Sequence, residues 1–373
     1  MNCRLCGNDN LVNVLRLDSF PKSAQFLPTE AEFEFDRGIN LEILSCQWCG
    51  LVQLSNEPVD YYKQVITAAN ISIESKRKLK CRFKKLIDQF ELVGKSALDV
   101  GCGTGGVVQI LREMGLNAHG LEYSLQNIVD ARNLGVPVSQ GYIEECTLPN
   151  KSDFFVCLNF LEHQPRPVRF LRAIFDNITE DGCGYITVPN LNYLLRNGAL
   201  HEFVADHLVY FTCETLEIAL RLTGFDCLNL ELINNKNDIA VTVKKRKKLQ
   251  LDSQKRMLQN KMTTLRQFVT KATKLGERLA VWGAGHRSLA LMSICDLSEI
   301  SFVIDSAKFK QGRFSPLLHK KIIAPEEIEE YDIDKVLIML PGDFSREAVD
   351  FLKNDHQKLG VYIFDDNEIC KVW

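Results

Sequence analysis

The sequence predicts an α/β protein built from two doubly wound parallel sheets, with a small cysteine-rich module in front of them. Three observations lead to this prediction. Apolar segments with strand character alternate with amphipathic helical patterns, a glycine-rich turn follows the first strand of each α/β region, and two Cys-x-x-Cys pairs lie near the N-terminus. Since 373 residues are too many for one ordinary domain, we predict three parts, at residues 1–70, 71–245 and 246–373.

The composition is that of a soluble globular protein without a strong charge field. Hydrophobic residues make up 46% of the chain and charged residues 25%, and the formal net charge is −3. No global basic field would attract nucleic acid or anionic lipid. No apolar run reaches the length of a membrane span, and the N-terminus lacks the apolar core of a signal peptide. We expect no membrane association and a location in the cytoplasm.

The 13 cysteines fall into two groups. Most stand singly in apolar segments, where buried free thiols in a reducing compartment explain them. The others form Cys3-x-x-Cys6 and Cys46-x-x-Cys49, each followed by a glycine that relieves a tight turn. Two residues between thiolates let both sulfurs face one ion, and four sulfurs fill a tetrahedral zinc shell. We predict a structural zinc ion on these four; four unrelated buried cysteines or a redox pair are the alternatives.

Strand and helix patterns alternate through residues 71–245. A basic amphipathic helix is predicted for residues 71–90, with its apolar residues on one face. The predicted strands are residues 96–100, 117–122, 153–158 and 184–188, with helical patterns between them. This alternation is typical of a doubly wound α/β sheet.

A glycine-rich turn, Leu98–Gly106, follows the first of these strands. Its glycines let the backbone approach a ligand that lies across the strand end. They also satisfy the dinucleotide fingerprint, so a nicotinamide cofactor is an alternative, as is a turn without a ligand. Asp99 suits the cationic amine of a methionine moiety better than a pyrophosphate, and Glu122 at the next strand end can accept both ribose hydroxyls. We predict S-adenosylmethionine, bound by Asp99, Gly101, Gly103, Gly105, Glu122 and Asn159.

A basic run, Lys244–Lys248, precedes the last part of the chain. We interpret it as a solvated boundary, with a nucleic-acid or membrane patch as the alternative. A connecting helix follows, whose apolar residues share one face: Leu258, Met262, Leu265, Val269 and Ala272. A second α/β unit is then predicted, with strands at residues 278–282, 301–305, 335–339 and 361–364.

The cysteine pairs, the Asp99–Gly105 segment and the second α/β unit together resemble the sugar C-methyltransferases, which act on nucleotide-linked keto-deoxysugars. The resemblance covers essentially the whole chain. Its further matches are Glu162–His163, Val188–Asn190, Asp206–Thr212, Trp282–Gly285 and Asp305–Pro316. It implies a zinc-containing enzyme that uses S-adenosylmethionine, with a Rossmann-like class I methyltransferase domain and a Rossmann-like C-terminal domain that binds substrate.

The resemblance also implies the catalytic residues. The residue that matches His207 is the proposed general base of that family, and an acid, here Asp206, precedes it. His207 would remove a proton from the carbon next to a sugar ketone, and its near-neutral pKa would leave it partly unprotonated at working pH. Without the resemblance, a structural histidine that packs or forms a hydrogen bond is the favoured interpretation of His207. We interpret His163 as support for the loop near the cofactor, and we assign Tyr62 and His201 to the substrate.

The second glycine turn, Val281–Ser288, offers backbone amides and a helix N-terminus to a phosphate. Arg287, Lys310 and Arg313 could add charge-assisted contacts to a diphosphate. We hypothesise that the nucleotide diphosphate of the substrate lies between this unit and the methyltransferase domain. A unit used only for packing is the alternative.

Other functions stay open at this point. They are an O-methyltransferase, an RNA-modifying or RNA-binding protein that uses the zinc module and the basic helix, an NAD-dependent oxidoreductase, and a non-catalytic scaffold. The near-neutral charge and the lack of a stretch that interleaves aromatic and basic residues count against RNA. We expect a small-molecule partner, a nucleotide sugar, and a monomer or homodimer.

Overall fold

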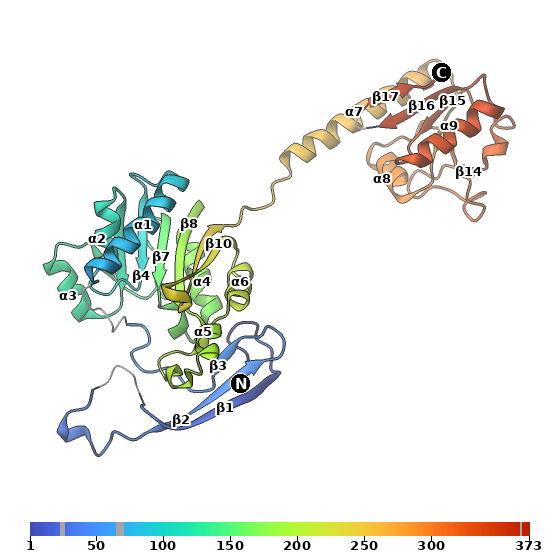
Figure 1. The fold of residues 1–373 in the computed structure, drawn as a ribbon. Coiled ribbons are helices and arrows are strands. Elements are labelled where there is room, and N and C mark those ends of the chain that lie inside the picture. Colours follow the sequence, from blue (N-terminus) through green and yellow to red (C-terminus); the bar gives the residue numbers. More distant parts are fainter. Residues whose placement is uncertain (23–26, 65–70, 366–367) are drawn as a thin grey trace. The chain divides into compact units, whose positions relative to one another are not determined.

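The computed structural model describes residues 1–373 with the exception of 23–26, 65–70 and 366–367. The chain divides into two compact units, Met1–Lys248 and Leu249–Trp373 (Figure 1). Each unit contains its own sheets and its own buried core. Among the described residues, no helix is long and apolar enough to cross a membrane.

The first unit begins with a small antiparallel sheet that surrounds the cysteine pairs. Its strands, in spatial order, are β1 (Leu11–Phe20), β2 (Ile39–Cys46), β3 (Val52–Leu54) and β9 (Val209–Tyr210). A short 3-10 helix, η1 (Glu30–Glu32), lies between β1 and β2 along the chain. β9 comes from far along the chain, and it pairs with β3 through Val52 opposite Tyr210. The N-terminal sheet is therefore completed by a strand that follows the predicted catalytic residues directly.

A seven-stranded sheet forms the centre of the first unit. In spatial order its strands are β10 (Phe225–Ile233), β11 (Asp238–Lys245), β8 (Ile178–Pro189), β7 (Ser152–Leu158), β4 (Ser96–Val100), β5 (Asn117–Glu122) and β6 (Val138–Gln140). The pairings from β8 through β6 are parallel, whereas β11 runs antiparallel to both of its neighbours. The four strands predicted for this region are all confirmed, and β4 and β5 have the predicted bounds.

Different helices cover the two faces of this sheet. The helices and 3-10 turns of the region are α1 (Ile73–Phe90), α2 (Gly106–Glu113), α3 (Leu125–Asn133), η2 (Leu161–His163), α4 (Pro167–Asp176), α5 (Leu191–Arg196), η3 (Leu200–Glu202), α6 (Cys213–Leu222) and η4 (Asn234–Lys236). Neighbouring residues of a strand point to opposite faces. Accordingly Phe154 packs with α1, α2 and α3, and Phe155 packs with α4 and α6.

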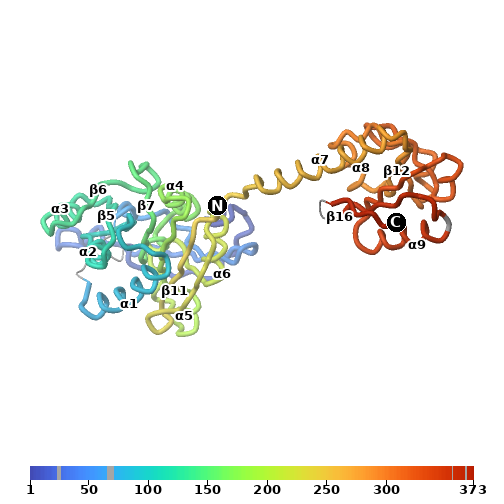
Figure 2. Tube along the Cα trace, turned by 90° about the horizontal axis from the view of Figure 1, so that it is seen from above, coloured from blue at the N-terminus to red at the C-terminus, as the bar shows by residue number. Residues whose placement is uncertain are grey.

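The second unit is a smaller doubly wound sheet. In spatial order its strands are β14 (Ile322–Ile323), β13 (Phe302–Ile304), β12 (Leu279–Trp282), β15 (Lys335–Ile338), β16 (Gly360–Asp365) and β17 (Glu368–Lys371). Only β17 is antiparallel among the described pairings of this sheet. Helices α7 (Asp252–Lys274) and α8 (His286–Ile294) pack on one face, and α9 (Asp343–Asp355) packs on the other, with η5 (Pro325–Glu327) before β15 (Figure 2).

The predicted apolar face of α7 is buried only in part. Leu265, Val269 and Ala272 lie in the core of the second unit, and Met262 is partly buried against it. Leu258, which was predicted to share this face, is 41% exposed. The first half of the helix lies beyond the sheet that covers its second half, and spacing alone gives no information about that boundary.

Candidate active site and zinc site

The four paired cysteines meet at one point of the N-terminal module. The sulfur of Cys3 lies 3.5 Å from that of Cys49, and the sulfur of Cys6 lies 3.6 Å from that of Cys46. All four sulfurs are within 4.8 Å of one another. Burial alone would raise the pKa of Cys46, but backbone N–H groups of its own turn lower it to about 7. Four thiolates at this spacing fit a tetrahedral zinc ion, and they leave it no open position for chemistry.

The glycine turn after β4 has the backbone conformation that only glycine adopts easily. Gly101, Gly103 and Gly105 have positive φ angles of 74°, 54° and 82°. A Cβ atom on Gly101 would lie 2.6 Å from Cδ1 of Phe160. A side chain at position 101 is therefore excluded by both strain and contact, which keeps the backbone of the turn accessible to a ligand.

Two buried acids flank this turn. The carboxylate of Glu122 accepts hydrogen bonds from the backbone N–H groups of Gly103 (2.9 Å), Tyr123 (3.0 Å) and Ser124 (2.8 Å). Asp99 is 3% exposed, and burial together with the nearby charge of Glu122 raises its pKa to about 7. A cationic amine beside Asp99 would relieve that unfavourable environment. Both acids thus fit the groups that S-adenosylmethionine presents.

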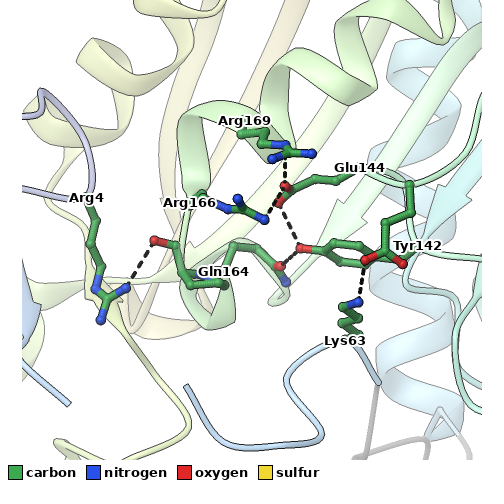
Figure 3. Close-up of polar contacts among 9 residues, drawn as sticks. Arg4, Lys63, Tyr142, Glu144, Gln164, Arg166 and Arg169 are labelled. Carbon is green, nitrogen blue, oxygen red and sulfur yellow. Dashed lines mark hydrogen bonds and ion pairs between the residues drawn. The ribbon is translucent and has the colours of Figure 1, made fainter. Parts of the chain in front are cut away.

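A small hollow of about 10 Å³ lies against the glycine turn, and it is lined by Gly101 and by apolar and aromatic side chains that include Leu121, Tyr123, Tyr142, Ile143 and Phe160. Lys63, from the segment after the N-terminal sheet, also lines it. Its ammonium group pairs with Glu145 and lies 5.1 Å from the ring centroid of Tyr123 and 5.2 Å from that of Tyr142 (Figure 3). Tyr123 directly follows Glu122, so an aromatic side chain of this lining stands next in the chain to the acid predicted to accept the ribose hydroxyls.

The structure places Asn159 apart from this cavity. Asn159 follows β7 with a φ of 44°, and its side-chain oxygen accepts a hydrogen bond of 2.7 Å from the hydroxyl of Thr187. It lines a separate hollow of about 280 Å³ together with residues of α1 and β8. Of the six residues assigned to the cofactor, Gly101 lines the hollow beside the glycine turn and Asn159 lines this other one; the assignment of all six to S-adenosylmethionine stays a prediction.

The predicted catalytic residues form a compact group between η2 and β9. The ring of His207 lies edge to face against that of His163, with centroids 4.7 Å apart. Nδ1 of His163 is 2.9 Å from the backbone oxygen of Asp206, and the backbone oxygen of Glu162 accepts from the N–H of Leu208 at 2.9 Å. One side-chain atom each of Glu162, His163 and His207 lies within 4.8 Å of the others. The turn before β9 and η2 thus hold each other in place.

Burial favours the neutral forms of His207, His163 and Glu162. Burial, and secondly the neighbouring His163, lower the pKa of His207 to about 3, although the ring keeps some contact with solvent. This value differs from the near-neutral pKa expected from the sequence, because the surrounding protein disfavours the imidazolium. Burial likewise lowers the pKa of His163 and raises that of Glu162 to about 8. The lone pair of His207 is therefore unprotonated at neutral pH.

The tyrosine that reaches this group is Tyr61. Its hydroxyl donates a 2.6 Å hydrogen bond to the carboxylate of Asp206. Tyr62, the residue assigned to substrate from the sequence, instead packs edge to face against Tyr142, with centroids 6.1 Å apart. His201 is exposed in η3. The segment 61–63 thus contacts both the catalytic group and the cavity beside the glycine turn.

The cations predicted for the second unit do not share a cavity. Arg287 and Arg313 are exposed, and the ammonium of Lys310 pairs with Asp305 at 2.9 Å. A cavity of about 350 Å³ lies at the carboxyl ends of β12, β13 and β15, and its lining includes Trp282, Asp305, Glu326, Phe344 and Glu347. None of the three cations belongs to that lining, so the expected cluster of positive charge is not assembled there.

Several residues of the site carry no signal that the sequence analysis recognised. Tyr61 and Lys63 stand in a short turn, and their targets are up to 145 residues away along the chain. Tyr142 and Gln164 are bonded to each other in the interior at 2.6 Å. Arg4 lies between two predicted cysteine ligands, and its side chain donates to backbone oxygens, which no residue type in the sequence indicates. Such contacts depend on tertiary packing, and only the tyrosine pair at 61–62 hinted at one of them.

Comparisons with known proteins agree with this arrangement. Three family models match consecutive parts of the chain: a zinc binding domain at residues 3–60, a methyltransferase domain at 75–230, and the C-methyltransferase C-terminal domain at 241–365. The C-methyltransferase NovU of Streptomyces niveus is 22% identical over an alignment of 394 positions, gaps included, that covers 94% of this chain and 93% of NovU.

Other similar proteins match only part of the chain. The ubiquinone biosynthesis O-methyltransferase of Pseudomonas aeruginosa is 31% identical over 111 residues, which are 27% of this chain and 47% of that protein. A solved S-adenosylmethionine-dependent methyltransferase of Archaeoglobus fulgidus is 20% identical, with a TM-score of 0.39, and covers 46% of this chain and 95% of its own. The three domain matches and the nearly full-length match to NovU agree: this chain is an S-adenosylmethionine-dependent methyltransferase and belongs to the zinc-containing C-methyltransferases.

Proposed function

We propose that the enzyme transfers a methyl group to a carbon atom next to the ketone of a nucleotide-linked keto-sugar. The observation that carries this proposal is the group around His207, where an unprotonated imidazole keeps some contact with solvent and is held beside His163 and Asp206. The nearly full-length similarity to a C-methyltransferase supports transfer to carbon. The sugar rests on the resemblance of the motifs.

The role of His207 in this proposal is that of a general base. Its free ring nitrogen takes the proton from the carbon next to the ketone, and the electron pair of that C–H bond forms the enolate. A base with a pKa of about 3 in the free protein is weak. The negative charge of the forming enolate beside it favours the imidazolium, and so raises the pKa of His207 at the moment of transfer.

The neighbouring residues orient this base. A backbone carbonyl only accepts hydrogen bonds, so the contact with Asp206 places the proton of His163 on Nδ1. Tyr61 holds the carboxylate of Asp206 from the other side. S-adenosylmethionine, when bound beside the glycine turn, supplies a sulfonium methyl group to the enolate carbon. Holding that carbon close to the methyl group supplies much of the acceleration.

We assign the nucleotide of the substrate to the second unit. Arg287, Lys310 and Arg313 are the residues proposed to contact its diphosphate, and Arg287 and Arg313 are exposed and accessible to such a ligand. Lys310 would have to share its charge between Asp305 and the phosphate. The cavity beside β12 offers aromatic side chains for a base and carboxylates for ribose hydroxyls.

A second candidate is transfer to oxygen, on a sugar or on another small molecule. The partial match to ubiquinone biosynthesis O-methyltransferases favours it, but that match covers only 27% of this chain. RNA methylation is a weaker alternative, because the chain has a net charge of −3.

The test is product analysis with a labelled methyl donor. The purified, zinc-loaded enzyme is incubated with ¹³C-methyl S-adenosylmethionine and a panel of nucleotide-linked keto-sugars, and the products are examined by NMR. A methyl carbon bonded to carbon supports the proposal. A methyl bonded to oxygen selects the second candidate, and transfer to RNA but to none of the sugars contradicts both.

A further inference from the structure

Arg4 connects the zinc site to the methyltransferase domain. It stands between the ligands Cys3 and Cys6, and its side chain leaves the zinc module. One guanidinium nitrogen donates to the backbone oxygen of Pro165 at 3.1 Å (Figure 3), and another donates to that of Asn56 at 2.8 Å. The planar guanidinium presents its donors in a fixed fork, so it holds two segments that lie more than 100 residues apart along the chain.

The backbone of Arg4 is fixed as well. Its N–H donates a 2.7 Å hydrogen bond to the side-chain oxygen of Gln53, a fully buried residue of β3. The amide nitrogen of Gln53 in turn reaches the backbone oxygen of Asn2. Because Cys3 and Cys6 on either side of Arg4 would both bind the zinc ion, the backbone of Arg4 is held in place.

The segment that Arg4 reaches, residues 160–166, is the meeting point of the active site. Gln164 is fully buried, donates to the backbone oxygen of Phe160 at 2.8 Å, and accepts from the hydroxyl of Tyr142 at 2.6 Å. Phe160 and Tyr142 both line the cavity beside the glycine turn. A shift of Pro165 would therefore be transmitted through Gln164 to the wall of that cavity.

A second set of contacts ties the same segment to Glu144. The carboxylate of Glu144, 1% exposed, lies 3.3 Å from the guanidinium of Arg166 and 2.9 Å from that of Arg169. Its other oxygen is 3.0 Å from the hydroxyl of Tyr142. Figure 3 shows these side chains converging on Tyr142. On the catalytic side, His163 of the same segment contacts Asp206. Segment 160–166 thus contacts both the glycine turn, through Phe160, and the catalytic group, through His163.

We propose that Arg4 is a positioning residue for methyl transfer: held by the zinc knuckle, it fixes segment 160–166 and with it Phe160, whose ring lies against Gly101 of the glycine turn. Zinc binding then affects methyl transfer indirectly, because the guanidinium of Arg4 connects the zinc module to the backbone oxygens of Pro165 and Asn56. The inference rests on methyl transfer from S-adenosylmethionine and is independent of the identity of the acceptor.

The test measures S-adenosylhomocysteine affinity by calorimetry, with the zinc content and thermal midpoint of every variant measured in parallel. Arg4→Ala should weaken the affinity about tenfold, because the charge-assisted hydrogen bond to Pro165 of the segment is lost together with the one to Asn56 that orients the guanidinium. Arg4→Lys keeps the charge but cannot hold both carbonyls in a fork, and it should recover only part of the affinity. Arg16→Ala is the matched control, since Arg16 belongs to the same module and pairs only with Asp18 and Glu42 among the described acids.

A double-mutant cycle separates positioning from a purely local role. If Arg4 acts through Tyr142, the double variant should lose less affinity than the product of the fold-losses of Arg4→Lys and Tyr142→Phe. A fold-loss in the double variant equal to that product would overturn the proposal. So would an affinity within about twofold of the wild type in both Arg4 variants. Should Arg4→Ala lose zinc or fail to fold, the cycle with Arg4→Lys decides.

Discussion

The imidazole rings of His163 and His207 lie edge to face, with their centroids 4.7 Å apart and their planes at 81°. Because Nδ1 of His163 contacts the backbone oxygen of Asp206, the orientation of that ring is fixed. The ring of His207 is then held between His163 on one side and Tyr210, at a centroid distance of 6.1 Å, on the other. β9, which contains Tyr210, pairs with the zinc module, so the placement of His207 depends on three parts of the first unit.

Replacing His207 should abolish most of the methyl transfer. His207→Asn keeps a polar side chain but removes the base, and we expect turnover to fall about 10³-fold, as is usual for a lost general base. S-adenosylhomocysteine affinity, measured by calorimetry, should stay unchanged. His319→Asn, an exposed substitution in the second unit, is the control. Full turnover in His207→Asn would remove His207 from the mechanism.

The burial of His207 should make the protein sensitive to mild acid. The unfolded chain binds a proton at this residue below pH 6.5, whereas the folded chain does so only near pH 3, so stability is lost as the pH falls through that interval. Between pH 7 and pH 5 the wild type should lose up to about 2 kcal/mol relative to His207→Asn. Urea unfolding of both proteins at the two pH values measures this difference. Parallel losses would show that His207 is not the buried neutral group described above.

Asp99 should make cofactor binding depend on pH. Its carboxyl has a pKa of about 7 in the free protein, and a cationic amine favours its ionised form. S-adenosylhomocysteine affinity should therefore fall about tenfold as the pH is lowered from 8 to 6. In Asp99→Asn the affinity should be low and nearly independent of pH, while Asp176→Asn, an exposed change at the end of α4, should behave as the wild type. If the wild-type affinity does not change over this pH range, Asp99 does not bind the amine of the cofactor.

The glycine turn should tolerate no side chain at position 101. Gly101→Ala combines a φ of 74° with a contact of 2.6 Å to Phe160, and it should eliminate measurable S-adenosylhomocysteine binding. Gly198→Ala is a matched control, because Gly198 also has a positive φ but no atom within 4 Å of the new Cβ. That change should cost only about 1 kcal/mol of stability and leave the affinity intact. Equal affinities in the two variants would mean that the turn does not approach the cofactor.

Loss of the zinc ion should affect more than the N-terminal sheet. Cys46→Ser removes one of four ligands, and metal content measured by mass spectrometry should fall from one ion per chain toward zero. Since β9 is the fourth strand of that sheet, turnover should fall as well. Cys81→Ser, which changes an exposed cysteine of α1, should retain zinc and turnover. A zinc-free Cys46→Ser protein with full activity would contradict the coupling between module and active site.

The sequence predicted the elements whose signal is local. The strands Ser96–Val100 and Asn117–Glu122 are short, buried and followed by glycine or an acid, and the structure has them at those bounds. The cysteine spacing led to the cluster of four sulfurs in the same way. In both cases one stretch of chain carries the whole pattern.

Features that depend on contacts between distant parts of the chain could not be predicted from the sequence. β9 has two residues and pairs with β3 about 150 positions earlier, so no periodic pattern reveals it. The pKa of His207 is set by the residues that bury it. The two bonds of Arg4 end on backbone oxygens, which every residue possesses, so residue type gave no indication of them.

The most direct test of the proposed chemistry is deuterium exchange without methyl transfer. The enzyme, saturated with S-adenosylhomocysteine, is incubated in D₂O with an accepted nucleotide-linked keto-sugar, and deuterium at the carbon next to the ketone is followed by NMR. The account predicts exchange at that single carbon in the wild type and its loss in His207→Asn. Exchange that is equally fast in His207→Asn would contradict abstraction of the proton by His207. Methyl transfer to a sugar that shows no deuterium exchange next to its ketone would contradict it as well.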